Sequence, residues 1–219
     1  MRAWQYLCDF GQESGLCTVG IDGLEGPSEI VIVADETANP VLCAADLLAQ
    51  AEHDALASAI LITNSPRLAN QVDKEVEAQL AELKRRSIAS EAVSRGMIVL
   101  VNSVDEAIEL VNLYAPEHLS LMVSGASSLV SGIHNAGCIF VGENSPVVLG
   151  DYVAGPSHVL PTGGSARFSS PLGVEDFLKF TNIVALDEAT MQELSQAAIT
   201  MAKAEGLDAH AQAMEKRLK

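Results

Sequence analysis

Positive charge is scarce in this sequence. Its 219 residues include 13 lysines and arginines against 29 aspartates and glutamates, which gives a formal net charge of −16. Affinity for nucleic acids and for anionic lipid surfaces rests largely on cationic contacts, so this balance argues against both kinds of partner. We therefore expect neither a nucleic-acid partner nor a membrane partner.

Long apolar runs are missing as well. The sequence has no uninterrupted apolar stretch of the roughly 18 residues that a membrane-spanning helix needs. Residues 1–7 lack the extended apolar segment of a signal peptide. The chain is therefore predicted to be soluble and cytoplasmic.

Paired cysteines and a complete phosphate-binding loop are also absent from the sequence. Cys8, Cys17, Cys43 and Cys138 show no CxxC spacing, which predicts reduced, mostly buried thiols rather than a zinc ribbon or a redox pair. The run Gly163-Gly164-Ser165 lacks the full glycine spacing that binds dinucleotides between a strand and a helix. No cofactor-binding residue is assigned in this chain.

Four apolar runs rich in β-branched residues predict strands, at residues 30–33, 59–63, 97–101 and 138–141. Continuous apolar runs are typical of strands that are buried on both faces of a parallel sheet. Helical patterns lie between them at 40–53, 66–94, 103–114 and 126–134, with room for one more strand before the last helix. This order predicts an α/β fold with a Rossmann-like, doubly wound, mostly parallel sheet.

Three regions are expected along the chain: an irregular leader at 1–17, the α/β domain at 18–172 and a helical tail at 173–219. The Gly- and Pro-bearing stretch 142–171 has no regular pattern, and loops of this length usually serve function. We therefore expect part of the active site there. Helical periodicity at 174–180, at 187–205 and again after Asp208 predicts the tail, which Gly206 interrupts.

Histidine, amide and carboxylate side chains supply a candidate metal site. Gln50 and His53 are three positions apart in a helical stretch, so both are expected on one helix face. Asp151 and His210 add a carboxylate and a second imidazole, and zinc accepts ligands of these types. A helical histidine equally fits a solvent-facing or hydrogen-bonded role, so the residues alone leave both interpretations open.

Glu117 and His118 form a candidate acid–base pair. An imidazole titrates near neutrality, and an adjacent carboxylate can orient it or activate a water molecule. The alternative is that both residues only end a helix or a strand. Ser28 either contacts a ligand or satisfies a turn, and His158 either orients a ligand or is structural. His134 is expected to end a helix and is left out of the site.

Several long motifs, taken in order, resemble the C-terminal half of histidinol dehydrogenase. They occupy residues 26–29, 34–40, 46–53, 114–119, 150–162, 166–170 and 205–210. The resemblance implies oxidation of L-histidinol to L-histidine through the aldehyde by a homodimeric enzyme that depends on zinc and NAD. It assigns zinc to Gln50, His53, Asp151 and His210, with His210 donated by the partner subunit.

The same resemblance assigns roles to the remaining candidates. Glu117 and His118 correspond to proton acceptors, and the substrate contacts correspond to Ser28, Gln50, His53, His118, Asp151, Glu205 and His210. The family enzyme's earlier half carries most of its NAD contacts and part of its sheet, and residues 1–17 do not follow the family pattern. The sheet is therefore expected to be incomplete. A fragment, a truncated gene and a shortened paralogue remain open.

Three functions are compatible with this sequence. The first is a zinc- and NAD-dependent histidinol dehydrogenase. The second is a non-catalytic remnant that binds zinc or imidazoles and dimerises or docks onto a full-length paralogue, which the missing half favours. The third is a metal-free α/β module in which the histidines are incidental.

Overall fold

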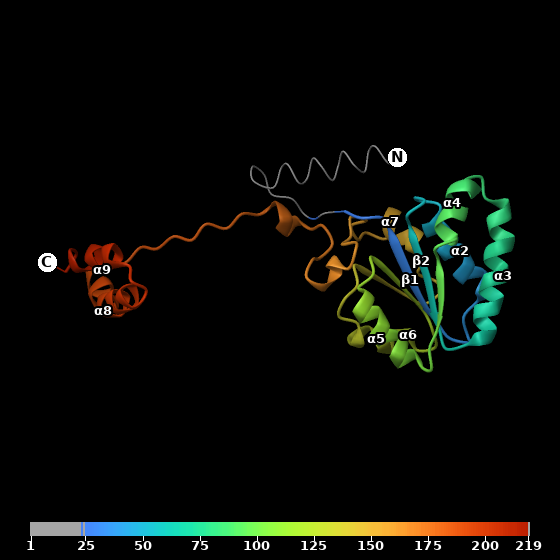
Figure 1. Ribbon diagram of the computed structural model, residues 1–219, viewed down its shortest axis with the longest axis horizontal. Helices are drawn as coiled ribbons and strands as arrows, with labels where there is room; N and C mark the ends of the chain where they lie inside the picture. The colour runs from blue at the N-terminus through green and yellow to red at the C-terminus, as the bar shows by residue number, and fades with distance from the viewer. Residues whose placement is uncertain (1–22, 24, 219) are drawn as a thin grey trace. The chain divides into compact units, whose positions relative to one another are not determined.

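Five parallel strands form one sheet in the computed structural model, which describes Gly23 and residues 25–218 (Figure 1). The strands are β1 (Glu29–Ala34), β2 (Ser58–Thr63), β3 (Met97–Leu100), β4 (His118–Met122) and β5 (Cys138–Val141). Their order across the sheet is β3-β2-β1-β4-β5, and every neighbouring pair is parallel. After β3 the chain returns to the middle of the sheet and places β4 on the other side of β1, so the direction of winding reverses. The predicted doubly wound α/β sheet is confirmed.

Helices cover both faces of the sheet (Figure 1). The first set comprises α2 (Pro40–Ala51), α3 (Pro66–Glu82) and α4 (Arg86–Val93). The second comprises α5 (Val104–Tyr114), α6 (Ala126–Leu129) and the 3-10 turn η1 (Val130–Gly132). Asn39, Ser65 and Ser103 each accept a backbone N–H at a helix start, as expected of N-cap residues.

The central strands carry apolar side chains on both faces, which explains their unbroken apolar runs. Ile30 and Ile32 of β1 pack with α2 and α3, whereas Val31 and Val33 pack with α5 and α6. All four side chains are at most 1% exposed. Because side chains alternate along a strand, two separate cores form, one on each face of the sheet.

Several helix bounds differ from those predicted. The helix expected at 40–53 ends at Ala51, and its last turn closes with a bond from the His53 N–H to the Gln50 carbonyl. The helix expected at 66–94 divides into α3 and α4, because Leu83 adopts an extended backbone. The irregular stretch 142–171 contains the short helix α7 (Val147–Tyr152) and the 3-10 turn η2 (Ser165–Arg167).

The chain divides into two compact units after Phe177. The helix expected at 174–180 is only the 3-10 turn η3 (Val174–Phe177). The second unit contains α8 (Glu188–Ala204) and α9 (Asp208–Glu215), which pack against each other with Gly206 in the left-handed conformation between them. No helix in the described part of the chain is long and apolar enough to cross a membrane. The predicted leader at 1–17 lies outside the described residues.

Candidate functional site

The candidate site lies at the amino ends of β1 and β4. Ser28 directly precedes β1 and Glu117 directly precedes β4, and the ladder pairs Ile30 with His118. Parallel neighbours bring their amino ends to the same edge of the sheet, so Ser28 and Glu117 meet although they are 89 positions apart. Doubly wound folds usually bind ligands at the opposite, carboxyl edge.

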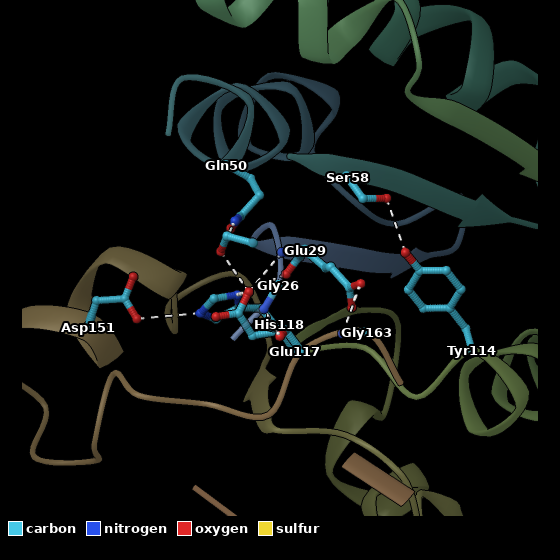
Figure 2. Close-up of polar contacts among 11 residues, drawn as sticks. Gly26, Glu29, Gln50, Ser58, Tyr114, Glu117, His118, Asp151 and Gly163 are labelled. Carbon is cyan, nitrogen blue, oxygen red and sulfur yellow. Dashed lines mark hydrogen bonds and ion pairs between the residues drawn. The ribbon is translucent and has the colours of Figure 1, made fainter. Parts of the chain in front are cut away.

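Helices deliver the other side chains to this edge. The helix α2 runs back across the sheet after β1, so its final turn carries Gln50 to the amino end of the strands. Gln50 is 3% exposed and its Nε2 donates to Ser28 Oγ (Figure 2). On α7, Asp151 points toward the ring of His118 (Figure 2).

The Glu117 carboxylate is the centre of the hydrogen-bond network. Its Oε2 accepts from Ser28 Oγ at 2.6 Å and from the Glu29 N–H at 2.8 Å, and it lies 3.4 Å from His118 Nδ1. Burial raises the pKa of Glu117, but the bonds from His118, Ser28 and Glu29 outweigh burial and leave the pKa below its usual value. Glu117 is therefore a buried carboxylate that stays ionised.

His118 has a defined tautomer. Its Nδ1 lies 2.9 Å from the Glu29 carbonyl oxygen, which can only accept, so Nδ1 must carry hydrogen. The other ring nitrogen, Nε2, is buried, has no hydrogen-bond partner among the described residues and lies 3.5 Å from Asp151 Oδ1. In the neutral ring Nε2 is therefore the atom that can accept a proton.

Nearby acceptors oppose the effect of burial on His118. Burial lowers the pKa of the ring, whereas the Glu117 carboxylate, the Glu29 carbonyl and the charge of Asp151 raise it. The raising contributions prevail, so the pKa of His118 lies above its ordinary value of 6.5. A buried imidazole with this pKa is suited to hold and release a proton near neutrality.

A cavity of about 190 Å³ brings several of the predicted residues together. It is lined by Ser28, His53, Glu117, His118, Asp151, Tyr152 and His158. His53 reaches it from the turn after α2, and His158 from the segment after α7. Tyr152, whose side chain is largely exposed, was not among the predicted residues.

Glu205 and His210 belong to the second unit, which is described by itself. Glu205 caps the end of α8 and His210 lies on α9. Both line a groove of about 360 Å³ between these helices, beside the apolar side chains of Met201, Leu207 and Met214. An imidazole and a carboxylate are thus presented together on an exposed surface.

Within residues 23 and 25–218, no three His, Cys, Asp or Glu side chains are grouped so that they could hold a metal ion. Among the predicted zinc ligands, His53 and Asp151 belong to these residue types and lie in the first unit. Gln50, whose side chain is an amide, lies in the same unit. The other histidine among these ligands, His210, belongs to the second unit. The donor types suit zinc, and both His53 and Asp151 line the cavity beside His118 and Ser28.

Sequence reasoning missed one part of the site, the main chain of Glu29. Its N–H binds Glu117 and its carbonyl accepts from His118, so the backbone of one residue fixes both candidate catalytic groups. The Glu29 side chain accepts from the Gly163 N–H at 3.2 Å, and burial raises the pKa of this carboxyl. Backbone contacts leave no residue-type signal, so no motif could have predicted them.

Fold and site together define an α/β protein with a buried carboxylate–imidazole pair at the amino edge of a parallel sheet. The family profile described as histidinol dehydrogenase matches residues 13–218 of this sequence. The chain belongs to the histidinol dehydrogenase family.

Individual relatives agree with this assignment. The histidinol dehydrogenase of Dehalococcoides mccartyi strain CBDB1 is 55% identical over 201 residues, which cover 91% of this chain and 46% of that protein. The histidinol dehydrogenase of Thermus thermophilus is 48% identical, over 91% of this chain and 48% of that protein. This chain therefore spans about half the length of the curated relatives that it matches.

A solved structure has the same fold. The crystal structure of histidinol dehydrogenase from Elizabethkingia anophelis superposes with a TM-score of 0.87 at 38% sequence identity. The match covers 96% of this chain and 49% of that one. The predicted family resemblance and the predicted fold are thus confirmed.

Proposed function

We propose that this chain carries the zinc-binding and proton-transfer part of a histidinol dehydrogenase, an oxidoreductase of histidine biosynthesis that acts on L-histidinol. The observation that carries the proposal is the Glu117–His118 pair. Its carboxylate is held ionised, and its imidazole Nε2, which has no hydrogen-bond partner among the described residues, lies beside the cavity that His53 and Asp151 also line. Membership of the family supports this substrate class.

The proton-transfer roles follow from the hydrogen bonds. With Nδ1 bound to the Glu29 carbonyl, His118 Nε2 would accept the proton of the substrate hydroxyl. Glu117 would take a proton from the water that adds to the aldehyde, and Ser28 would exchange its bond to Glu117 for a bond to the substrate. NAD would accept the hydride in the full-length family enzyme, and we assign no NAD contact to this chain.

The metal role is proposed for Gln50, His53, Asp151 and His210. Zinc bound there would fix the imidazole and the amine of the substrate and polarise its hydroxyl. Two observations support this set: its amide, imidazole and carboxylate groups suit zinc, and His53 and Asp151 share a cavity to which Gln50 is connected through Ser28. Glu205 would contact the substrate from the same unit as His210.

We further propose that the chain forms a homodimer in which His210 and Glu205 complete the site of a second copy. Both residues lie on an exposed groove whose apolar side chains suit burial against another surface. Deletion of residues 206–219 should then weaken both self-association and zinc binding. Sedimentation of the truncated chain as the same species, with unchanged zinc affinity, would contradict the proposed dimer.

Zinc binding has a sharp test in two histidine variants. Purified wild-type protein should hold about one zinc per chain after dialysis, and His53→Ala should hold almost none. His134→Ala is the matched control, because His134 is exposed and lies outside the cavity. Equal zinc contents of the wild type and of His53→Ala would contradict the metal assignment. The interpretation as a metal-free α/β module would then stand.

The alternative function is a non-catalytic zinc- and imidazole-binding chain that dimerises or docks onto a full-length paralogue. The region of sequence in hand, which matches 46% and 48% of two curated relatives, is compatible with it. Holding the nicotinamide near the substrate carbon can contribute about 7–11 kcal/mol toward the barrier. A chain without that contribution should bind L-histidinol without oxidising it.

An absorbance assay for NADH, with zinc, L-histidinol and NAD added to the isolated chain, tests the non-catalytic alternative. We expect ligand binding, measured by calorimetry, without NADH formation. Turnover near that of a typical enzyme, about 10 per second, would contradict the non-catalytic alternative. Failure of both binding and turnover would contradict both functions.

A further inference from the structure

The helix α7 rests on the ring of Phe140 at a residue that has no side chain. A Cβ atom built at Gly150 would lie 2.8 Å from Cζ of Phe140 and closer still to Cε1. Carbon atoms in ordinary contact are about 3.5–4.0 Å apart, so any larger residue would force the helix and the ring apart. The contact is buried, since both Gly150 and Phe140 are buried.

The same contact determines where Asp151 lies. On α7 only Val147 and Gly150 are buried, and they are three positions apart on one face. Val148, Leu149 and Tyr152 are 44% to 76% exposed, and no side chain caps the helix start. The position of α7 therefore depends on Val147 and on the approach of Gly150 to Phe140, and Asp151 follows directly after Gly150.

The Phe140 ring also lies near His118. Phe140 is on β5, where the ladder pairs it with Ser120 and pairs Cys138 with His118. The centroids of the two rings are 6.1 Å apart, with 33° between the ring planes. One aromatic ring thus touches the helix of Asp151 and also neighbours His118.

We infer that Phe140 and Gly150 are positioning residues: their contact sets the separation of Asp151 from His118, and thereby the place of a proposed metal ligand relative to the proposed base. The zinc readout of this inference rests on the proposed function. The geometric part does not, because the separation of 3.5 Å between His118 Nε2 and Asp151 Oδ1 is set by the fold and can be measured without zinc.

The first test is Gly150→Ala. The backbone of Gly150 is not in the left-handed region, and alanine is the better helix former, so a loss cannot come from local conformation. A displacement of about 1 Å is needed to relieve the overlap. We expect the dissociation constant for zinc, measured by competition with a chelator, to rise about 10- to 100-fold. Val148→Ala, on the exposed face of α7, should leave it unchanged.

A rescue variant tests the cause. Leucine at position 140 lacks the two ring atoms, Cε1 and Cζ, that the added Cβ would meet first. Phe140→Leu in the Gly150→Ala background should therefore recover most of the lost zinc affinity. Phe140→Leu alone adds no bulk to the helix, and we expect it to stay folded with a modest loss of affinity. If the two substitutions only destabilised the protein, their losses of zinc affinity would add in the double variant.

The outcomes separate this inference from the proposed function. Unchanged zinc affinity in Gly150→Ala, or a double variant no better than Gly150→Ala, overturns the positioning inference while wild-type zinc binding stands. If the wild type binds no zinc, the proposed function fails. Crystal structures of chelator-treated wild type and Gly150→Ala then decide: a widened separation of His118 Nε2 from Asp151 Oδ1 supports the inference, and an unchanged separation overturns it.

Discussion

Ser28 lies between Gln50 and Glu117 and connects them: its hydroxyl accepts from Gln50 Nε2 and donates to Glu117 Oε2 at 2.6 Å. The contact joins the end of α2 to the start of β4 across the beginning of β1. A proposed zinc ligand and a proposed proton acceptor therefore share one hydroxyl group, and a change in either affects the other.

Ser28→Ala tests this link. The substitution leaves the buried Gln50 amide without its acceptor and removes one of the bonds that hold Glu117 ionised. We expect a loss of about 1–2 kcal/mol in the free energy of unfolding, measured with urea on metal-free protein. Ser128→Ala is the control, because that hydroxyl donates to a carbonyl on the exposed surface. Equal effects of the two substitutions would contradict a special role for Ser28.

Gly137→Ala should disturb the start of β4. A Cβ at Gly137 would lie 2.6 Å from the carbonyl oxygen of Glu117, so that strand would have to shift. Overpacking of this kind costs about 1–3 kcal/mol, and a fall in the free energy of unfolding of that size is expected. Gly132→Ala is the matched control, since its Cβ would meet Ile108 at an ordinary 3.8 Å. Stability equal to that of the control would contradict the crowding.

Asp46→Asn should make the protein more stable at neutral pH. Burial raises the pKa of Asp46 from 3.8 to about 6. The folded chain binds this proton more tightly than the unfolded chain, so stability is lost as the pH rises through the interval between these two values. Removing the charge should gain about 1 kcal/mol at pH 7, after allowance for partial exposure, and nothing below pH ~4. Urea unfolding across this range measures it, and a gain that does not depend on pH would contradict the cause.

Ser120→Ala should be harmless or slightly stabilising. Ser120 is 1% exposed, and its hydroxyl has no hydrogen-bond partner within the described residues. Removing an unsatisfied buried hydroxyl is expected to change the free energy of unfolding by between zero and about +1 kcal/mol. Ser195→Ala offers the comparison, because that buried hydroxyl donates to the Gln192 carbonyl and its loss should destabilise. A marked loss in Ser120→Ala would indicate a partner such as a buried water.

Strands were predictable where apolar residues run without interruption. The runs at 30–33, 59–63, 97–101 and 138–141 correspond to β1, β2, β3 and β5. The strand β4 is expected from the sequence without definite bounds, because His118 and Ser120 interrupt its apolar pattern. Both polar residues stand on a fully buried strand, where apolar side chains are the usual choice.

Short elements and exact helix ends were less predictable for a physical reason. The helix α7 has only two buried positions, and one of them is a glycine, so it leaves no apolar periodicity. The 174–180 stretch has helical spacing but exposes Val174, Phe177 and Phe180, so no packing supports a helix there. By contrast, the second-unit helix α8 begins after Asp187, as the sequence predicts.

The sequence predicted some of the side chains that line the candidate cavity, and it did not predict their geometry. Motifs identified Ser28, Glu117, His118 and Asp151, which line one cavity. The bond from His118 to the Glu29 carbonyl and the contact of Gly150 with Phe140 depend on how two strands and a helix meet. Such contacts arise from tertiary structure, and single-sequence patterns do not encode them.

Because the candidate site lies at the amino edge, the length of the strands separates it from the carboxyl edge of the sheet. Asn64 follows the last residue of β2 and is exposed, whereas Ser58 begins the same strand beside Tyr114. The six steps from Ser58 to Asn64 along extended backbone span roughly 20 Å. A spectroscopic label attached at position 64 would therefore report on ligand arrival at the proposed site from a fixed distance, without touching the side chains proposed to bind the ligand.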